Sequence, residues 1–386
     1  MKKRPHRYVL VLLAAAGMLG SPLPALAVAH AASAVPSASV SWTFGPSLPF
    51  AATRWDGAYV ARLNRVYFLG FRASDATTDG SVWYYDVAAG TYVDTGVDMQ
   101  VPVSNYEIAE LRDAHGIGLY IFGGRDGLGN LVDTVQAFYP GSNKAVVLDT
   151  DPWPGRTPSG CVSLPATGVA TLANNAYVLG GLSFSLNGCL DEQSAQTWVF
   201  DPLAAAGSRW TQGPNLNVAR GYITAGALGG KIYAIGGDIN AAGTPTPIST
   251  VEAWLPPAGG WNDAGIADLP IPCDESQAFP STNGPLKRGI VLATCGQWPN
   301  AIPDTYFYDE RTNAWSDVGA VNETRRNEAG ALIPGGSPLL MFVVGGYASD
   351  GVTALSSSET GSAGRAADRP GFSGPLPVTG SRPTTS

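Results

Sequence analysis

Six near-copies of one strand ending are spaced along the chain. Each copy has an aromatic or apolar residue, two more residues that are mostly apolar, and then Gly-Gly or a close variant. The copies begin at Tyr67, Tyr120, Tyr177, Tyr233, Leu292 and Phe342. The intervals between them are therefore 53, 57, 56, 59 and 50 residues. Because short strands repeated at about 50 residues are typical of a β-propeller, the sequence predicts an all-β propeller with six blades.

Each unit reads as four strands. The first holds small residues, as in 221–228, and the second ends in Gly-Gly. The third carries an aromatic residue followed by Asp and a turn, and the fourth carries Trp; both are clear in 198–210 and 306–315. Two consecutive glycines permit backbone conformations and close approaches that a Cβ atom would block. The order predicts a four-stranded meander in every unit.

This pattern resembles the kelch repeat family over roughly residues 38–360. Two units depart from the motif: the second has Phe138-Tyr-Pro140 where Tyr-Asp is expected, and the fifth has Cys295 in place of the first glycine. The resemblance implies a six-bladed kelch-type β-propeller.

The sixth unit has no fourth strand after residues 356–359, and the missing strand is expected at the other end of the chain. Trp42-Thr-Phe-Gly-Pro46 matches Trp210-Thr-Gln-Gly-Pro214, which belongs to a fourth strand. We therefore predict that the N-terminal strand completes the last blade and closes the ring without an open sheet edge. The propeller would occupy residues 35–360, followed by a disordered tail rich in Pro, Gly, Ser and Thr at 361–386.

The first 34 residues are typical of a signal peptide. A basic start with four Lys or Arg residues precedes an apolar stretch at 9–19 and small-residue cleavage sites. No later segment has 18 uninterrupted apolar residues, so we expect a secreted or extracytoplasmic protein with no membrane span, and a monomer. The net charge of −8 would become −12 without this segment. Such an acidic chain is a poor candidate for binding nucleic acid or an anionic membrane.

The four cysteines fall into two local pairs, Cys161 with Cys189 and Cys273 with Cys295. Local pairing is the simplest of the three possible connectivities, and an oxidising compartment favours disulfides. A metal site is the weaker alternative, because no CxxC spacing exists and His115 is the only histidine within the repeats. We expect two disulfide bonds, no metal and no other cofactor.

Strand direction places the start of each first strand and the loop between the second and third strands on one face. Both cysteine pairs and the long loops 182–196 and 238–250 belong to this loop-rich face. Loops on a rigid scaffold commonly hold binding residues.

Counting 16 residues back from the glycine position finds charged residues in several units. They are Arg54, Glu107 and Arg220, with Arg326 after a three-residue insertion and Glu275 beside Asp274 in the fifth unit. We predict that they ring the central channel, where arginines bind a carboxylate or a sulfated sugar. The alternative is structural, with each arginine holding backbone carbonyls. Trp55 and Tyr106, beside these positions, either stack on a sugar or pack between blades.

The sequence favours an exported, non-catalytic propeller that binds a protein or an extracellular glycan through its loop-rich face. The alternative is a carbohydrate mutarotase or epimerase, with Glu107 beside Arg54, or Glu275 beside Arg326, moving a proton at the channel mouth. A single histidine cannot supply the ligands of copper radical oxidases that resemble galactose oxidase. Serine-hydrolase chemistry lacks its Gly-x-Ser-x-Gly motif. We assign no catalytic residue.

Overall fold

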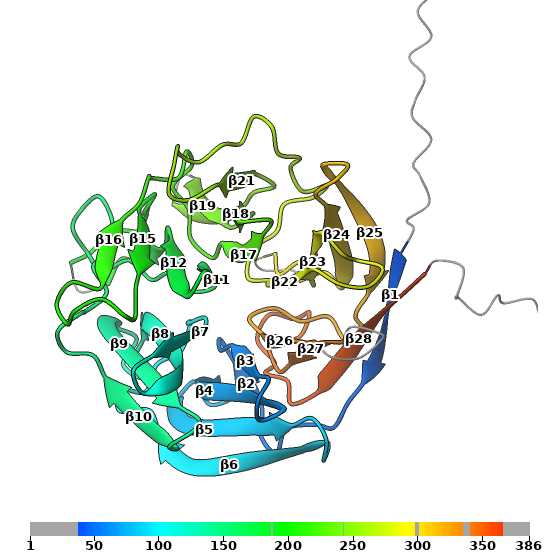
Figure 1. Ribbon diagram of the computed structural model, residues 1–386, viewed down its shortest axis with the longest axis horizontal. Helices are drawn as coiled ribbons and strands as arrows, with labels where there is room; N and C mark the ends of the chain where they lie inside the picture. The colour runs from blue at the N-terminus through cyan, green and yellow to red at the C-terminus, as the bar shows by residue number, and fades with distance from the viewer. Residues whose placement is uncertain (1–37, 187, 242, 298–300, 335–339, 366–386) are drawn as a thin grey trace, which may run out of the picture. The chain divides into compact units, whose positions relative to one another are not determined.

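The computed structural model describes residues 38–186, 188–241, 243–297, 301–334 and 340–365. This part of the chain contains strands and loops but no helix. Six antiparallel sheets surround a central axis (Figure 1). The predicted six-bladed propeller is therefore confirmed.

Each blade places its first strand innermost (Figure 1). Blade 1 consists of β3 (Gly57–Val60), β4 (Arg65–Ala73), β5 (Thr78–Asp86) and β6 (Thr91–Asp98), with β2 (Ala52–Thr53) added beside β4. Blade 2 consists of β7 (Ala109–Asp113), β8 (Gly116–Arg125), β9 (Leu131–Tyr139) and β10 (Lys144–Val147). Blade 3 consists of β11 (Val169–Leu172), β12 (Asn175–Leu179), β15 (Thr197–Phe200) and β16 (Trp210–Gln212).

Blade 4 consists of β17 (Thr224–Leu228), β18 (Lys231–Ile235) and β21 (Val251–Trp254). The fourth strand predicted for every unit is reduced in this blade to a single bridge between Ala253 and Asn262. Blade 5 consists of β22 (Gln277–Ser281), β23 (Gly289–Ala293), β24 (Asp304–Asp309) and β25 (Ala314–Ala320). Blade 6 consists of β26 (Ala329–Ile333), β27 (Leu340–Val344), β28 (Ser358–Arg365) and β1 (Ala38–Phe44). Small hairpins extend blades 3 and 4 at the loop-rich face: β13 (Leu182–Ser183) with β14 (Glu192–Gln193), and β19 (Asp238–Ala241) with β20 (Thr244–Pro247).

The N-terminal strand completes the last blade, as predicted. β1 pairs antiparallel with β28, with Trp42 opposite Gly361. β28 continues to Arg365, so the predicted end of the propeller at residue 360 was five residues too early. The run 361–364 consists of Gly, Ser and Ala only, and its pattern gives no strand signal without the partner strand. Residues 1–34 and 366–386, which include the predicted signal peptide and most of the tail, lie outside the described residues.

The hydrophobic core consists of layers between adjacent blades. Trp261 is 6% exposed and packs with Trp254 between blades 3 and 4. Between blades, the Trp210 ring of blade 3 lies 5.3 Å from the Phe122 ring of blade 2, and the Trp254 ring of blade 4 lies 5.7 Å from the Tyr177 ring of blade 3, both as ring-centroid distances. Buried aromatic pairs of this kind stabilise the interface beyond the area that they remove from water. Trp210 and Trp254 therefore pack each blade against the one before it.

The glycine pairs join one blade to the next. Gly237 ends the second strand of blade 4, and its N–H donates to the Cys273 carbonyl of blade 5 at 2.8 Å. A Cβ atom on Gly236 would lie 2.1 Å from the same carbonyl oxygen, and φ at this residue is 56°. Only glycine accommodates both conditions. Equivalent bonds join Gly181 to the Arg220 carbonyl and Gly346 to the Ala52 carbonyl.

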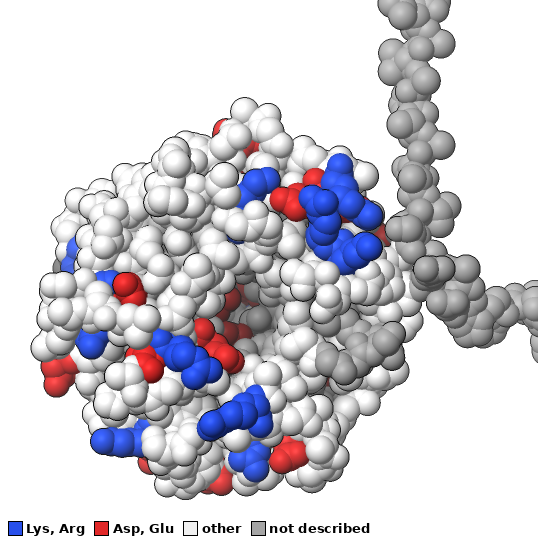
Figure 2. All heavy atoms as spheres, viewed as in Figure 1, with Lys and Arg blue, Asp and Glu red and all other residues white. Residues whose placement is uncertain are grey.

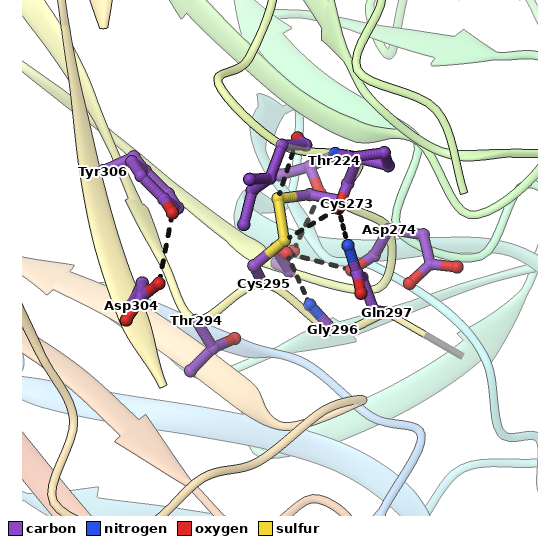
Figure 3. The surroundings of a disulfide bond; sticks show 12 residues. Thr224, Cys273, Asp274, Thr294, Cys295, Gly296, Gln297, Asp304 and Tyr306 are labelled. Carbon is purple, nitrogen blue, oxygen red and sulfur yellow. Dashed lines mark hydrogen bonds between the residues drawn. A yellow bond between two sulfur atoms is a disulfide. The ribbon is translucent and has the colours of Figure 1, made fainter. Parts of the chain in front are cut away.

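Both predicted disulfide bonds are present. Cys161 pairs with Cys189, and Cys273 pairs with Cys295 at the end of β23 (Figure 3). Cys295 occupies the first glycine position of blade 5, so the disulfide forms where other blades have Gly-Gly. Two disulfides are typical of a protein that folds in an oxidising, extracellular environment.

Replacing both Cys161 and Cys189 with Ser should lower the free energy of unfolding by roughly 3 kcal/mol. The bond spans 28 residues, and its loss frees that loop in the unfolded chain. Urea unfolding of the variant and the wild-type protein, both without reductant, measures the change. An unchanged midpoint would mean that the disulfide contributes nothing to stability.

Candidate functional site

A chain of backbone hydrogen bonds runs around the axis at the loop-rich face. It joins one residue from each of five blades, all with left-handed φ values between 45° and 58°: Arg54, Asn105, Tyr222, Glu275 and Asn327. We call these five residues the axial ring. The N–H of Asn105 donates to the Arg54 carbonyl at 2.6 Å, and the N–H of Arg54 to the Asn327 carbonyl at 2.8 Å. In the same way, the N–H of Asn327 donates to the Glu275 carbonyl at 3.4 Å, and the N–H of Glu275 donates to the Tyr222 carbonyl at 3.3 Å.

The side chains of the axial ring meet across the channel. The Tyr222 hydroxyl of blade 4 accepts from Arg54 Nη1 of blade 1 at 3.5 Å and from Asn105 Nδ2 of blade 2 at 3.3 Å. Arg54 Nε also donates to the Tyr347 hydroxyl at 3.3 Å. Tyr222 is 7% exposed, so its phenol forms the floor of the channel mouth.

Arg326 and Glu275 complete this site. Arg326 Nη1 donates to Glu275 Oε2 at 2.7 Å, and its guanidinium lies 4.9 Å from the centroid of the Tyr347 ring. The Arg54 guanidinium lies 5.4 Å from the same centroid. The structure therefore brings together three of the five residues chosen from the sequence. We call Arg54, Tyr222, Glu275, Arg326 and Tyr347 the mouth cluster.

Arg220 is not part of the mouth cluster, contrary to the prediction. It is fully buried within blade 4, where Nη1 is paired with Glu252 and Nη2 donates to the Ala234 carbonyl at 3.1 Å. No ligand can reach it there. Arg325 has the same role in blade 6, where it is paired with Glu359 at 3.0 Å. The structural alternative is thus right for Arg220.

Glu107 also lies away from the mouth cluster. It is two residues past Asn105 of the axial ring, and it accepts the Val169 N–H at 2.6 Å. A fixed count of 16 residues fails because the distance from the first hairpin to the glycine pair differs between blades. The hairpins β7–β8 and β17–β18 both have two residues, but Gly123 lies seven residues after the start of β8, whereas Gly236 lies five residues after the start of β18. Trp55 and Tyr106 are 2% and 1% exposed, so they pack between blades and do not face a ligand.

Three arginines of blades 1 and 2 give one side of the mouth a positive charge. Arg54, Arg72 and Arg125 are each partly exposed. Burial, together with the nearby charges of Arg54 and Arg72, lowers the pKa of Arg125 below its ordinary value. Among the described residues, none of the three forms a salt bridge. The mouth therefore presents clustered positive charge that a carboxylate would neutralise.

Carboxyl groups of blades 4 and 5 line the other side. Asp238 is 2% exposed, and burial together with the nearby Glu275 raises the pKa of its carboxyl to about 7. Sequence reasoning missed Asp238, Arg125 and Tyr347, although all three directly follow a Gly-Gly pair. That shared position was the available signal, because the glycine pair ends the second strand beside the channel.

A second group of carboxyls lies one or two residues before the first strands of blades 1, 2 and 6. Burial raises the pKa of Asp56 and of Glu328 to about 7, and that of Glu107 well above its ordinary value. Asp56 Oδ2 accepts the Ile108 N–H at 2.9 Å, and Glu328 Oε1 accepts the Thr294 hydroxyl at 2.7 Å. Figure 2 shows a hollow at the centre of the propeller with acidic atoms inside it. Within the described residues, no three His, Cys, Asp or Glu side chains are placed to hold a metal ion.

Comparisons with known proteins support the repeat assignment. A family model described as the kelch motif matches residues 219–265, which contain blade 4. The chain is 36% identical over 169 residues to human kelch repeat and BTB domain-containing protein 13, covering 42% of this chain and 30% of that protein. It is 27% identical over 179 residues to beta-scruin of Limulus polyphemus, covering 43% and 18%. These matches support kelch-type repeats in this six-bladed β-propeller.

These alignments cover less than a third of each curated relative, so they describe the repeats and not the whole of those proteins. In a solved structure, YjhT, the fold is similar with a TM-score of 0.59 at 16% identity, covering 81% of this kelch chain and 95% of that one. This likeness concerns the fold alone. Among the described residues, no helix has the length and apolar character to cross a membrane. A kelch propeller is in general a scaffold for non-catalytic binding.

The buried carboxyls should make the protein less stable at pH 8 than at pH 5. A carboxyl whose pKa is raised by folding stabilises the fold fully below its unfolded pKa, near 4, and this contribution is lost as the pH rises to about 7. Glu328→Gln should remove roughly 2 kcal/mol of this difference, because the amide imitates the protonated acid. Denaturant unfolding at both pH values measures it.

The matched control is Glu359→Gln. It removes the buried partner of Arg325 and leaves only the partly exposed Glu323, 3.6 Å away, so it should destabilise the protein by a few kcal/mol at both pH values. Equal pH dependence in Glu328→Gln and the wild-type protein would contradict the prediction.

Proposed function

We propose that this propeller is an exported, non-catalytic binding protein that takes a partner protein on its loop-rich face as a monomer. An acidic side chain of the partner contacts Arg54, Arg72 and Arg125. The observation that carries the proposal is this group of three arginines, which have no salt-bridge partner among the described residues and sit partly exposed at the mouth. Arginine binds a carboxylate through paired, charge-assisted hydrogen bonds.

Apolar side chains in the surrounding loops support a protein as the ligand. Leu128 is 90% exposed, Leu190 56% and Val352 76%, and all three lie in loops between a second and a third strand. Leu186, in the same loop as Leu190, is 44% exposed. Exposed apolar side chains grouped around a charged centre are typical of a protein-binding surface. The partner surface is therefore expected to combine an acidic residue with apolar neighbours.

Selection of a displayed random-peptide library on the immobilised protein tests the proposal. Enriched peptides should carry Asp or Glu beside an apolar residue, and Arg125→Gln should weaken the binding of a selected peptide about tenfold, as expected for the loss of a charge-assisted hydrogen bond. Arg62→Gln, an exposed arginine near the turns of the opposite face, is the control. Peptides that bind Arg125→Gln and the wild-type protein equally would refute a role for the arginines.

A sugar-converting enzyme remains the second candidate, and one observation favours it. Burial and the nearby charge of Glu275 raise the pKa of the Asp238 carboxyl to about 7, so one proton is available at the mouth near neutral pH. Opening a hemiacetal ring requires only a proton donor and a proton acceptor. Arg54 would hold the carboxylate of an acidic sugar beside them.

Anomer exchange of an acidic sugar, followed by NMR, separates the two candidates. The enzyme predicts faster exchange in the presence of the protein and a loss of at least a hundredfold in Asp238→Asn. Binding without faster exchange would leave a sugar-binding protein. If the protein showed no binding and no faster exchange, the enzyme would be excluded. The protein-binding proposal would then rest on the peptide selection.

A further inference from the structure

A pocket lies between blades 2 and 3, on the face opposite to the loop-rich face. Its volume is about 290 Å³, near the lower end of the range for small-molecule sites. Its polar lining comes from the end of β7 and the turn after it, from β8 and β9, from the start of β10, and from the residue before β16. The side chains that matter are Asp113, His115, Tyr120, Tyr139, Lys144 and Arg209. None of them belongs to the mouth cluster.

The floor of the pocket is a hydrogen-bonded carboxylate. Asp113 Oδ2 accepts from the Tyr120 hydroxyl at 2.8 Å and from the Tyr139 hydroxyl at 2.6 Å, while Oδ1 accepts the His115 N–H at 2.7 Å. Burial alone would raise the pKa of the Asp113 carboxyl, but these hydrogen bonds hold it below its ordinary value. The two hydroxyls also lie 3.2 Å from each other, so one can accept from the other. Tyr120 is 1% exposed and Tyr139 is 6% exposed, so the Tyr139 oxygen is the one that can accept from a further donor such as a sugar hydroxyl.

The rim carries the opposite charge. Arg209 Nη1 is paired with Asp151 at 2.6 Å, and the Arg209 side chain is 21% exposed. Lys144 and His115 are exposed beside it, and the His115 ring packs edge-on against Tyr139. Apart from Asp113, no acidic residue lines the pocket. Val146 and Leu148 supply an apolar wall.

We propose that this pocket binds a single sugar ring that carries an anionic substituent, either a carboxylate or a sulfate ester. The substituent contacts Lys144 and Arg209, a ring hydroxyl donates to the Tyr139 oxygen, and an apolar face of the ring lies on Val146 and Leu148. The inference is independent of the function proposed for the loop-rich face.

Isothermal titration with glucuronate, glucose 6-sulfate, glucose and inorganic sulfate tests the proposal. At least one acidic sugar should bind about tenfold more tightly than both glucose and inorganic sulfate, because only it satisfies rim and floor together. Lys144→Gln should weaken that binding about tenfold. Lys287→Gln, an equally exposed lysine at a turn of blade 5, should leave it unchanged.

Lys144 is solvent-exposed, so its variant is expected to fold, and Tyr139→Phe provides a second test of the hydroxyl contact. Arg125→Gln, at the mouth of the other face, should leave acidic-sugar binding unchanged. The proposal is overturned if no acidic sugar binds more tightly than inorganic sulfate, or if Lys144→Gln binds as the wild type does. Loss of binding in Arg125→Gln but not in Lys144→Gln would also overturn it, because the sugar would then occupy the mouth.

Discussion

The axial ring is the constraint on which the centre of this propeller depends. Five residues with side chains adopt left-handed φ values, a conformation that costs on the order of 1 kcal/mol or more at each non-glycine position. The cost is offset because each strained peptide joins a backbone hydrogen bond to the neighbouring blade. The same turn directs Arg54, Tyr222 and Glu275 toward the axis. The backbone arrangement that holds five blades at a fixed spacing is therefore also the one that assembles the mouth cluster.

The fold could be predicted from the sequence because its signals are local and repeated. Gly-Gly recurs wherever a second strand meets the next blade, and Trp42 repeats the surroundings of Trp210, which indicated how the ring closes. The site was predicted less well, because an axial position depends on strand and hairpin lengths that differ between blades. Arg54 and Glu275 were found, Arg326 was found one residue before the ring, and Arg220 and Glu107 were misplaced by two residues in opposite directions.

The buried arginines show why residue type alone could not decide between structure and function. Arg220 and Arg325 are paired with Glu252 and Glu359 of the third strands, and each glutamate also accepts backbone N–H groups from the segment before its arginine. In blade 2 the neutral Gln136 binds the Val101 N–H and carbonyl in a similar way. A third-strand carboxylate thus marks an arginine as structural. Arg54, Arg72 and Arg125 have no such carboxylate among the described residues, and only they remain available at the mouth.

Tyr222 separates the arginines at the mouth from the buried carboxyls in the interior of the propeller. Its phenol spans from blade 4 to Arg54 and Asn105 of blades 1 and 2, so a ligand at the mouth contacts the phenol before it can approach Asp56 or Glu107. Were the channel open there, the arginines and these buried carboxyls would form one continuous polar site, and the carboxyls would lose the burial that raises their pKa. Because they remain buried, their protonation responds to folding more than to ligands. The loop-rich face can therefore hold an anion without disturbing the acidic interior of the propeller.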